Sequence, residues 1–107
     1  MNQDRLTHLL EYYNDDPNDP FNIYALATEY TSTEPEKALE YFEILMDKHP
    51  DYIATYYHLA NLYLDLGQDE KAKTTFEKGI EKATAQNEAL LLRELRNAYD
   101  EFMMDYL

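Results

Sequence analysis

Three histidines are the first candidates for chemistry, because imidazole is the side chain most often used as a general base and as a metal ligand. They are His8, His49 and His58. They lie in separate segments, and none belongs to the HExxH pattern that places two zinc ligands on one face of a helix. A histidine at the surface or between helices is therefore the simpler interpretation, and we predict no metal site.

The remaining reactive groups also lack a catalytic pattern. Carboxylates occur in consecutive pairs, whose members point to different sides of a helix and indicate solvated charge. These pairs are Asp15-Asp16, Asp69-Glu70 and Asp100-Glu101. The sequence has no cysteine, which excludes thiolate nucleophiles and disulfides, and its two glycines, Gly67 and Gly79, cannot form a phosphate-binding loop. We therefore expect a protein that is not an enzyme, with no catalytic residues and no cofactor.

The charge of the chain restricts its partners. Nine basic residues against twenty-two acidic residues give the 107-residue chain a formal charge of −13 at pH 7. This charge repels phosphate, so we expect no nucleic-acid partner, and it also opposes binding to an anionic membrane. No run of about eighteen apolar residues could span a bilayer, and the first ten residues lack the order of a signal peptide. Together with the lack of cysteine, these features predict a cytoplasmic location.

The elements that position any site are predicted to be helices. Fifteen leucines and ten alanines accompany no valine, which is a helix-forming composition. Six segments repeat apolar residues at the helical spacing i, i+3, i+4, i+7 or close to it. They span residues 6–13, 23–30, 38–45, 56–63, 72–83 and 92–106. The sequence therefore predicts an all-α fold of about six helices.

Capping residues predict where the second and third helices begin. Asp19 supplies an N-cap oxygen directly before Pro20, whose missing N–H costs nothing in a first turn. Thr33 and Glu36 have the spacing of a capping box, with Pro35 inside the first turn. These patterns predict helix starts near Pro20 and Glu34.

The later helix boundaries have weaker signals. Asp51, after the helix-ending Pro50, is the predicted N-cap of the fourth helix. Gly67 offers the left-handed conformation that closes this helix. No proline or glycine separates the last two helices, so we predict Asn87 as the N-cap of the sixth, with one continuous helix as the alternative.

Two segments of the chain repeat each other. Residues 17–30 match residues 50–63 at an offset of 33, and the helices that follow match at an offset of 34. The matched pairs include Tyr24 with Tyr57, Leu26 with Leu59, Ala27 with Ala60, Tyr30 with Tyr63, Ala38 with Ala72 and Phe42 with Phe76. A unit of this length, made of two short helices, cannot bury its own apolar stripe, so the units must stack on one another.

The repeated residues resemble the pattern of the tetratricopeptide repeat family, in which an aromatic residue, Leu-small-x-x-Tyr, Gly, Ala, Phe, a small residue and Pro follow in order. The second unit carries Tyr56, Leu59, Ala60, Tyr63, Gly67, Ala72, Phe76 and Gly79, with Thr84 in place of the proline. The first carries Ile23, Leu26, Ala27, Tyr30, Ala38, Phe42, Leu45 and Pro50. The resemblance implies a right-handed superhelical stack of antiparallel helix hairpins.

On this resemblance we predict one domain over residues 1–107. Residues 1–16 form an N-terminal half-repeat helix, 17–50 the first repeat, 51–84 the second repeat and 85–107 a C-terminal capping helix. The family also lines a concave groove with the first helix of each repeat, and the groove holds a peptide or a helix of a partner protein.

The resemblance places a specific set of residues in this groove. The predicted peptide-binding residues are Phe21, Tyr24, Thr28, Tyr57, Asn61, Leu64, Arg93 and Asn97, with Ala54 and Leu90 beside them. Tyr24 and Tyr57 lead this set because tyrosine offers broad contact with few rotatable bonds, and the alternative for each is a packing role with the hydroxyl at the surface. An acidic rim favours a basic or amphipathic-helical partner, so we predict a protein–protein interaction adaptor.

The end of the chain supports an alternative function. Apolar residues there cover more of the last helix than packing on one neighbour needs, and methionine suits adaptable contacts. The predicted self-association residues are Phe102, Met103, Met104 and Leu107. In this alternative the protein is a structural or self-associating protein that homodimerises through its C-terminal helix.

Overall fold

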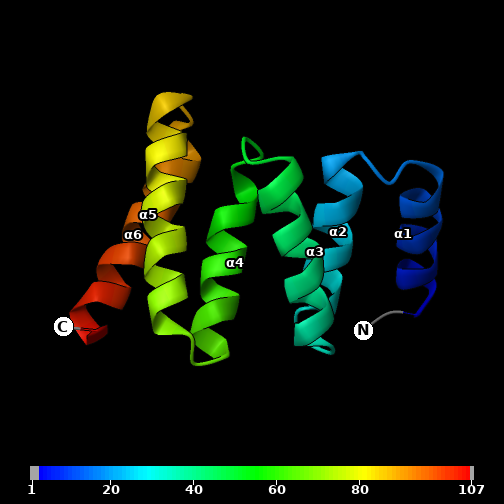
Figure 1. Cartoon of the computed structure of the whole chain (residues 1–107), viewed down its shortest axis with the longest axis horizontal. Coiled ribbons are helices and arrows are strands. Elements are labelled where there is room, and N and C mark those ends of the chain that lie inside the picture. The colour runs from blue at the N-terminus through cyan, green and yellow to red at the C-terminus, as the bar shows by residue number, and fades with distance from the viewer. Residues whose placement is uncertain (1–2, 107) are drawn as a thin grey trace. The chain divides into compact units, whose positions relative to one another are not determined.

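Six helices account for most of residues 3–106, which are the part of the chain that the computed structural model describes (Figure 1). They are α1 (Gln3–Asp15), α2 (Pro20–Tyr30), α3 (Pro35–Lys48), α4 (Ala54–Asp65), α5 (Asp69–Ala85) and α6 (Ala89–Tyr106). No strand occurs in these described residues. The predicted all-α fold of six helices is confirmed, and α5 and α6 are separate helices.

The helices form two compact units that divide between Tyr52 and Ile53. The first unit contains α1, α2 and α3, and the second contains α4, α5 and α6.

The core of the first unit lies between α2 and α3. The two helices pack on each other, and α2 also packs on α1. The buried side chains are Ile23, Leu26, Ala27 and Tyr30 from α2 and Ala38, Phe42 and Leu45 from α3. Three tyrosines join the helices, because the ring of Tyr41 lies 5.6 Å from that of Tyr13 in α1 and is stacked 5.9 Å from that of Tyr30 in α2.

The starts of α2 and α3 differ in how well they were predicted. Asp19 is the N-cap of α2, and its carboxylate accepts a 2.9 Å hydrogen bond from the N–H of Phe21, as predicted. α3 begins at Pro35, next to the predicted start near Glu34, but the predicted capping box of Thr33 and Glu36 is wrong, because Glu34 is the N-cap and there is no side-chain cap bond. The N–H groups of Thr33 and Glu34 both donate to the carbonyl of Tyr30, so Thr33 belongs to the turn that closes α2.

The core of the second unit is built on α5, which packs against both α4 and α6. Its largest buried side chains include Tyr56, Leu59 and Leu62 from α4, Phe76 from α5 and Leu95 from α6. Gly79 lets α5 approach its neighbours closely, since a Cβ atom there would lie 2.6 Å from the Cβ of Tyr56 and 3.2 Å from Leu95. The small residue at this place in the repeat is therefore required by packing.

The predicted N-caps of α4 and α6 are wrong in detail. Asp51 does not cap α4, because the N–H of Tyr52 donates to the carbonyl of His49 in a turn, and the helix begins at Ala54 after Ile53 as N-cap. Asn87 does not start α6 but ends α5. It has a positive φ of 57°, and the next N–H, that of Glu88, donates to the carbonyl of Ala83.

The end of α5 has the same geometry as the end of α4, where the predicted left-handed Gly67 is confirmed with a φ of 75°. There the N–H of Gly67 donates to Leu64 and the N–H of Gln68 donates to Tyr63. This pair of bonds satisfies carbonyls that a helix end leaves without intrahelical partners. Asparagine replaces glycine at the second of these ends because its short polar side chain tolerates the left-handed region.

Candidate protein-binding cleft in the second unit

A hollow of about 370 Å³ lies between α4 and α6 in the second unit. We call it the α4/α6 cleft. It is lined by Tyr57, Asn61, Leu64, Asp69, Ala98, Glu101, Phe102, Asp105 and Tyr106. Apolar and acidic side chains therefore share its walls.

The α4 wall is one face of that helix. Tyr57, Asn61 and Leu64 are spaced by four and three residues, which places them on the same side. All three are half-buried. The side-chain amide of Asn61 donates a 2.9 Å hydrogen bond to the carbonyl of Tyr57, which fixes the amide along the wall. The wall thus presents an aromatic ring, an amide and an aliphatic side chain in order.

Two aromatic rings, those of Phe102 and Tyr106, form part of the α6 wall. Phe102 is only 7% exposed, and its ring lies 5.9 Å from that of Phe76 and 5.0 Å from that of Tyr106. The hydroxyl of Tyr106 donates to the carboxylate of Glu70, and the ammonium of Lys73 lies 5.8 Å from the Tyr106 ring centre. Contacts to α5 therefore hold both rings in place.

A second, adjoining hollow of about 240 Å³ continues along α6. It is lined by Tyr57, Glu94, Asn97, Ala98 and Glu101. Tyr57, Ala98 and Glu101 line both hollows, so the two form one continuous face, which we call the α4/α6 face.

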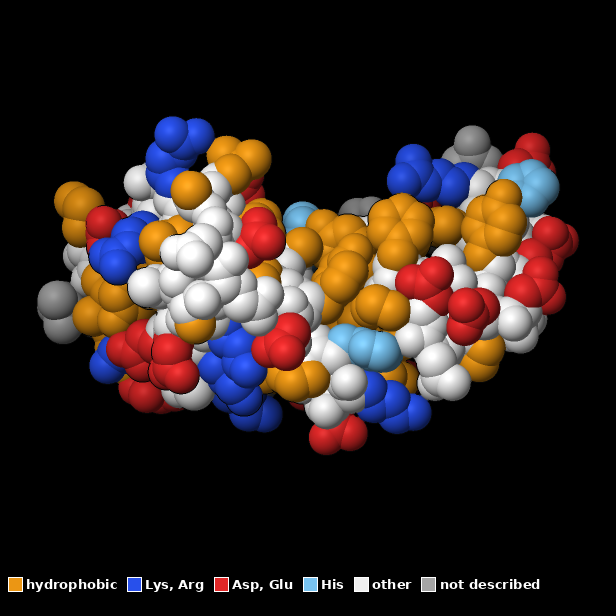
Figure 2. All heavy atoms as spheres, turned by 90° about the horizontal axis from the view of Figure 1, so that it is seen from above, with side chains coloured by type: hydrophobic (Ala, Val, Ile, Leu, Met, Phe, Trp, Pro, Cys, Tyr) orange, Lys and Arg blue, Asp and Glu red, His pale blue; other side chains and the backbone are white. Residues whose placement is uncertain are grey.

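Negative charge dominates the lining of this face. The carboxylates of Asp69, Glu94, Glu101 and Asp105 line it, and no lysine or arginine is among the described residues that line either hollow. Elsewhere on the second unit, the view in Figure 2 shows basic and acidic side chains mixed. Beside the face, burial lowers the pKa of the His58 imidazole below its ordinary value, while the Glu94 carboxylate acts in the opposite direction.

Comparison with known proteins agrees with the repeat pattern. A family model described as tetratricopeptide repeat matches residues 31–95. The chain belongs to the tetratricopeptide repeat family. Proteins of this family generally bind other proteins and are generally non-enzymatic adaptors. No curated protein matches the chain.

Solved tetratricopeptide repeat structures are similar to the chain. One is a crystal structure of a tetratricopeptide repeat domain protein from Salinibacter ruber, which is 40% identical with a TM-score of 0.76, over 79% of this chain and 96% of that chain. A solution structure of a tetratricopeptide repeat domain protein from the same organism is 41% identical with a TM-score of 0.77, over 81% and 89%. The crystal structure of MamA has the same fold at 18% identity and a TM-score of 0.64, over 92% and 65%.

The structure brings together four of the residues that the tetratricopeptide repeat pattern predicts for binding. Tyr57, Asn61 and Leu64 line the α4/α6 cleft, and Asn97 lines the adjoining hollow. Arg93 is exposed on α6 but does not line either hollow.

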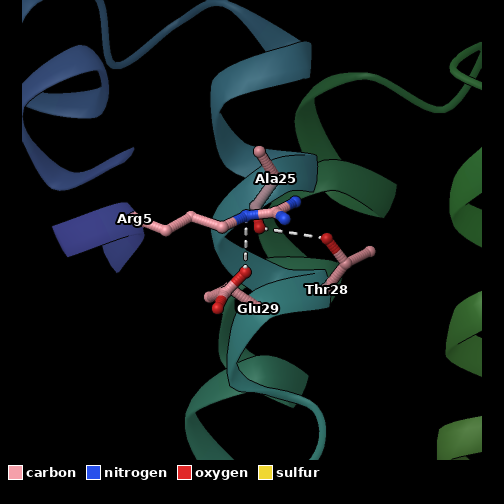
Figure 3. A network of polar contacts seen from close by, with 4 residues as sticks. All are labelled: Arg5, Ala25, Thr28 and Glu29. Atoms are coloured by element: carbon pink, nitrogen blue, oxygen red, sulfur yellow. Dashed lines mark hydrogen bonds and ion pairs between the residues drawn. The ribbon is translucent and has the colours of Figure 1, made fainter. Parts of the chain in front are cut away.

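Three further predicted residues lie on α2 in the first unit. Phe21 is 58% exposed, and the ring of Tyr24 lies 5.5 Å from that of Tyr52. The hydroxyl of Thr28 donates a 3.0 Å hydrogen bond to the carbonyl of Ala25 (Figure 3). In the same view Arg5 of α1 forms a 3.0 Å ion pair with Glu29, whose side chain comes from the next position of α2.

The acidic residues of the α4/α6 face were not predicted as binding residues. Glu94, Glu101 and Asp105 are separated by seven and four residues, so they lie on one face of α6. This spacing is visible in the sequence and was the available signal. Asp69 has no such signal, because its place at the cleft depends on how α5 begins after Gly67.

The predicted self-association residues have different surroundings from one another. Phe102 packs inside the unit, Met103 is half-buried and Met104 is 83% exposed. Leu107 lies outside the described residues. Homodimerisation through α6 therefore stays a prediction.

Within residues 3–106 no group of three or more His, Asp or Glu side chains could hold a metal ion. No helix among the described residues is both long enough and apolar enough to cross a membrane.

Proposed function

We propose that this protein is an adaptor that binds a segment of a partner protein on the α4/α6 face. The observation that carries the proposal is that Tyr57, Asn61 and Leu64, selected by repeat position alone, line one hollow with aromatic and apolar walls. Asn97 extends the same face along α6. Such a mixture of tyrosine, amide and aliphatic groups is typical of surfaces that bind protein segments.

The proposal extends to how the chain is divided. We propose repeats at residues 17–50 and 51–84, with residues 1–16 and 85–107 as the end helices of a single domain. Phe21, Tyr24 and Thr28 are the proposed contacts of the first unit with a partner, and Arg93 is a proposed contact at the edge of α6.

Peptide selection tests the proposed site without knowledge of the natural partner. Random peptides displayed on phage are selected on the full chain, and the selected peptides are synthesised and titrated by calorimetry. We expect Tyr57→Ala and Asn61→Ala to weaken binding about tenfold, because a central tyrosine or a fixed amide carries much of the energy of such contacts. Circular dichroism of each variant verifies that the helices are intact.

The chain offers matched controls for both substitutions. Tyr12 and Asn14 are exposed on α1, in the first unit, so Tyr12→Ala and Asn14→Ala remove the same groups outside the α4/α6 face. We expect both control variants to bind the selected peptides as the wild type does. Equal loss in the control and site variants, or no loss in either, would contradict the proposed site.

A further inference from the structure

The acidic residues of the α4/α6 face form a stripe. Glu94, Glu101 and Asp105 project from one side of α6, and with a rise of 1.5 Å per residue the first two lie about 10 Å apart along the axis and the last two about 6 Å apart. Asp69 joins Glu101 and Asp105 in the larger hollow, whereas Glu94 shares the smaller hollow with Glu101. The stripe therefore creates two neighbouring acidic positions, one in each hollow.

Each acidic position adjoins apolar surface. The larger hollow is lined by carboxylates together with Leu64 and the rings of Phe102 and Tyr106, and the smaller hollow by carboxylates together with Tyr57 and Ala98. Lysine and arginine side chains complement such a surface, because each has an aliphatic stem that packs on apolar groups and a positively charged end that stays at the surface. A basic side chain can therefore satisfy both parts of each hollow.

The chain itself places no basic side chain among the described residues that line these hollows beside the carboxylates. Lys73, which comes near the larger hollow, has its ammonium above the ring of Tyr106. A bound segment with positive charge would supply the missing complement and would also approach faster, because the field of the chain attracts it.

We propose that the α4/α6 face selects a basic segment whose two lysine or arginine side chains occupy the two hollows. This inference rests on the proposed function and names the chemistry of the partner. In a segment with the polyproline II conformation, which has three residues per turn, residues i and i+3 lie on the same side about 9 Å apart. This distance is close to the spacing of about 10 Å along α6 from Glu94 to Glu101. One charged end meets Glu94 and Glu101, and the other meets Asp69, Glu101 and Asp105.

A pair of synthetic peptides isolates the charge of the partner. The probe is acetyl-Arg-Ala-Ala-Arg-amide, and its control is the same peptide with citrulline, which keeps the shape of arginine without its charge. Titration of the full ¹⁵N-labelled chain should shift the amide resonances of Tyr57, Ala98 and Glu101. We expect the citrulline peptide to bind about tenfold more weakly, because charge-assisted hydrogen bonds are roughly twice as strong as neutral ones.

Matched variants separate the stripe from the general negative charge. Glu101→Gln with Asp105→Asn removes two charges from the cleft, and Asp15→Asn with Asp47→Asn removes two exposed charges from the first unit. We expect the first pair to weaken binding of the arginine peptide about tenfold and the second pair to change it less than about twofold. Glu94→Gln with Glu101→Gln is a second variant of the α4/α6 face, in case the first pair disturbs folding.

The outcomes distinguish this inference from the proposed function. Equal binding of the arginine and citrulline peptides, equal loss in the two variant pairs, or shifts confined to other surfaces would overturn the basic occupant. If phage-selected peptides nevertheless lose affinity in Tyr57→Ala and Asn61→Ala, the adaptor site stands with a different occupant. If those peptides are also unaffected, both proposals fail.

Discussion

Gly79 and Tyr56 are in such close contact that no side chain fits between their helices. A Cβ atom built at Gly79 would lie 2.6 Å from the Cβ of Tyr56 and 3.1 Å from its Cγ. Tyr56 is fully buried, and its Cβ cannot move without its backbone. The spacing of α4 and α5 in the second unit is therefore determined by this pair.

Gly79→Ala should destabilise the protein by about 1–3 kcal/mol, although alanine is the better helix former, because the added methyl group overpacks the contact with Tyr56. Urea unfolding followed by circular dichroism measures the loss. Lys78→Ala, at the exposed neighbouring position, should change the free energy of unfolding by less than about 0.5 kcal/mol. A variant at Gly79 that is as stable as the wild type would contradict the close contact.

Asn87→Gly should stabilise the protein by up to about 1 kcal/mol, because glycine adopts the positive φ of this position without the strain of a side chain. Asn87→Ala should destabilise it by about 1 kcal/mol, since alanine tolerates the left-handed region less well than asparagine. Thermal and urea unfolding give both changes. Gln86→Ala is the control, because Gln86 has a negative φ of −98° and its substitution should be nearly neutral.

The ends of α4 and α5, at Gly67 and Asn87, illustrate what the sequence predicts and what it does not. Gly67 is unambiguous, because glycine after an apolar stripe is the usual left-handed end of a helix. Asn87 is ambiguous, since asparagine is favoured both at an N-cap and at a left-handed helix end, and only the hydrogen bond from Glu88 to Ala83 decides between them. The predicted capping roles of Thr33 and Asp51 were wrong for a related reason, because each residue lies in a turn that closes before the next helix begins.

The candidate site was predictable in part. The resemblance to the tetratricopeptide repeat pattern selected Tyr57, Asn61 and Leu64 by their places in the repeat, and helical spacing puts them on one face of α4. The contribution of Asp69 depends on where α5 starts, and the orientation of α6 is determined by the packing of Phe102 on Phe76. Contacts between residues far apart in the sequence supply this information, and a single sequence does not.

Phe102→Ala should destabilise the protein by about 3 kcal/mol or more, because it leaves a cavity beside Phe76 and Tyr106. Met104→Ala, at a side chain that is 83% exposed, should change stability by less than about 0.5 kcal/mol. Urea unfolding separates the two variants.

Sedimentation velocity at several concentrations tests the alternative of a dimer, since an association that Met104→Ala abolishes would support self-association through α6.

The stability of the protein should depend on pH through His58. Its pKa in the folded protein is lowered, chiefly by burial, so the unfolded chain binds the proton first as the pH falls. The contribution of neutral His58 to the free energy of unfolding is fully present above the ordinary imidazole pKa of 6.5, and it is lost as the pH falls through the pKa of the folded protein. Urea unfolding at a series of pH values measures this loss.

His58→Gln provides the comparison for that series, because every other titrating group is shared with the wild type. The stability of the wild type should fall more steeply with acidification than that of the variant, below about pH 6.5. Parallel curves for the two proteins would show that His58 is not the responsible group.

The attachment of α1 has a consequence for how the protein opens. None of the described side chains of α1 is fully buried, and the helix is held to the rest of its unit by the Arg5–Glu29 ion pair, the Tyr13–Tyr41 ring contact and hydrogen bonds from Asn22 to backbone carbonyls. The apolar side chains that α1 itself contributes, those of Leu6, Leu9, Leu10 and Tyr13, are only half-buried. The amide hydrogens of α1 should therefore exchange with solvent through a local opening, at a lower free energy than those of α2 and α3.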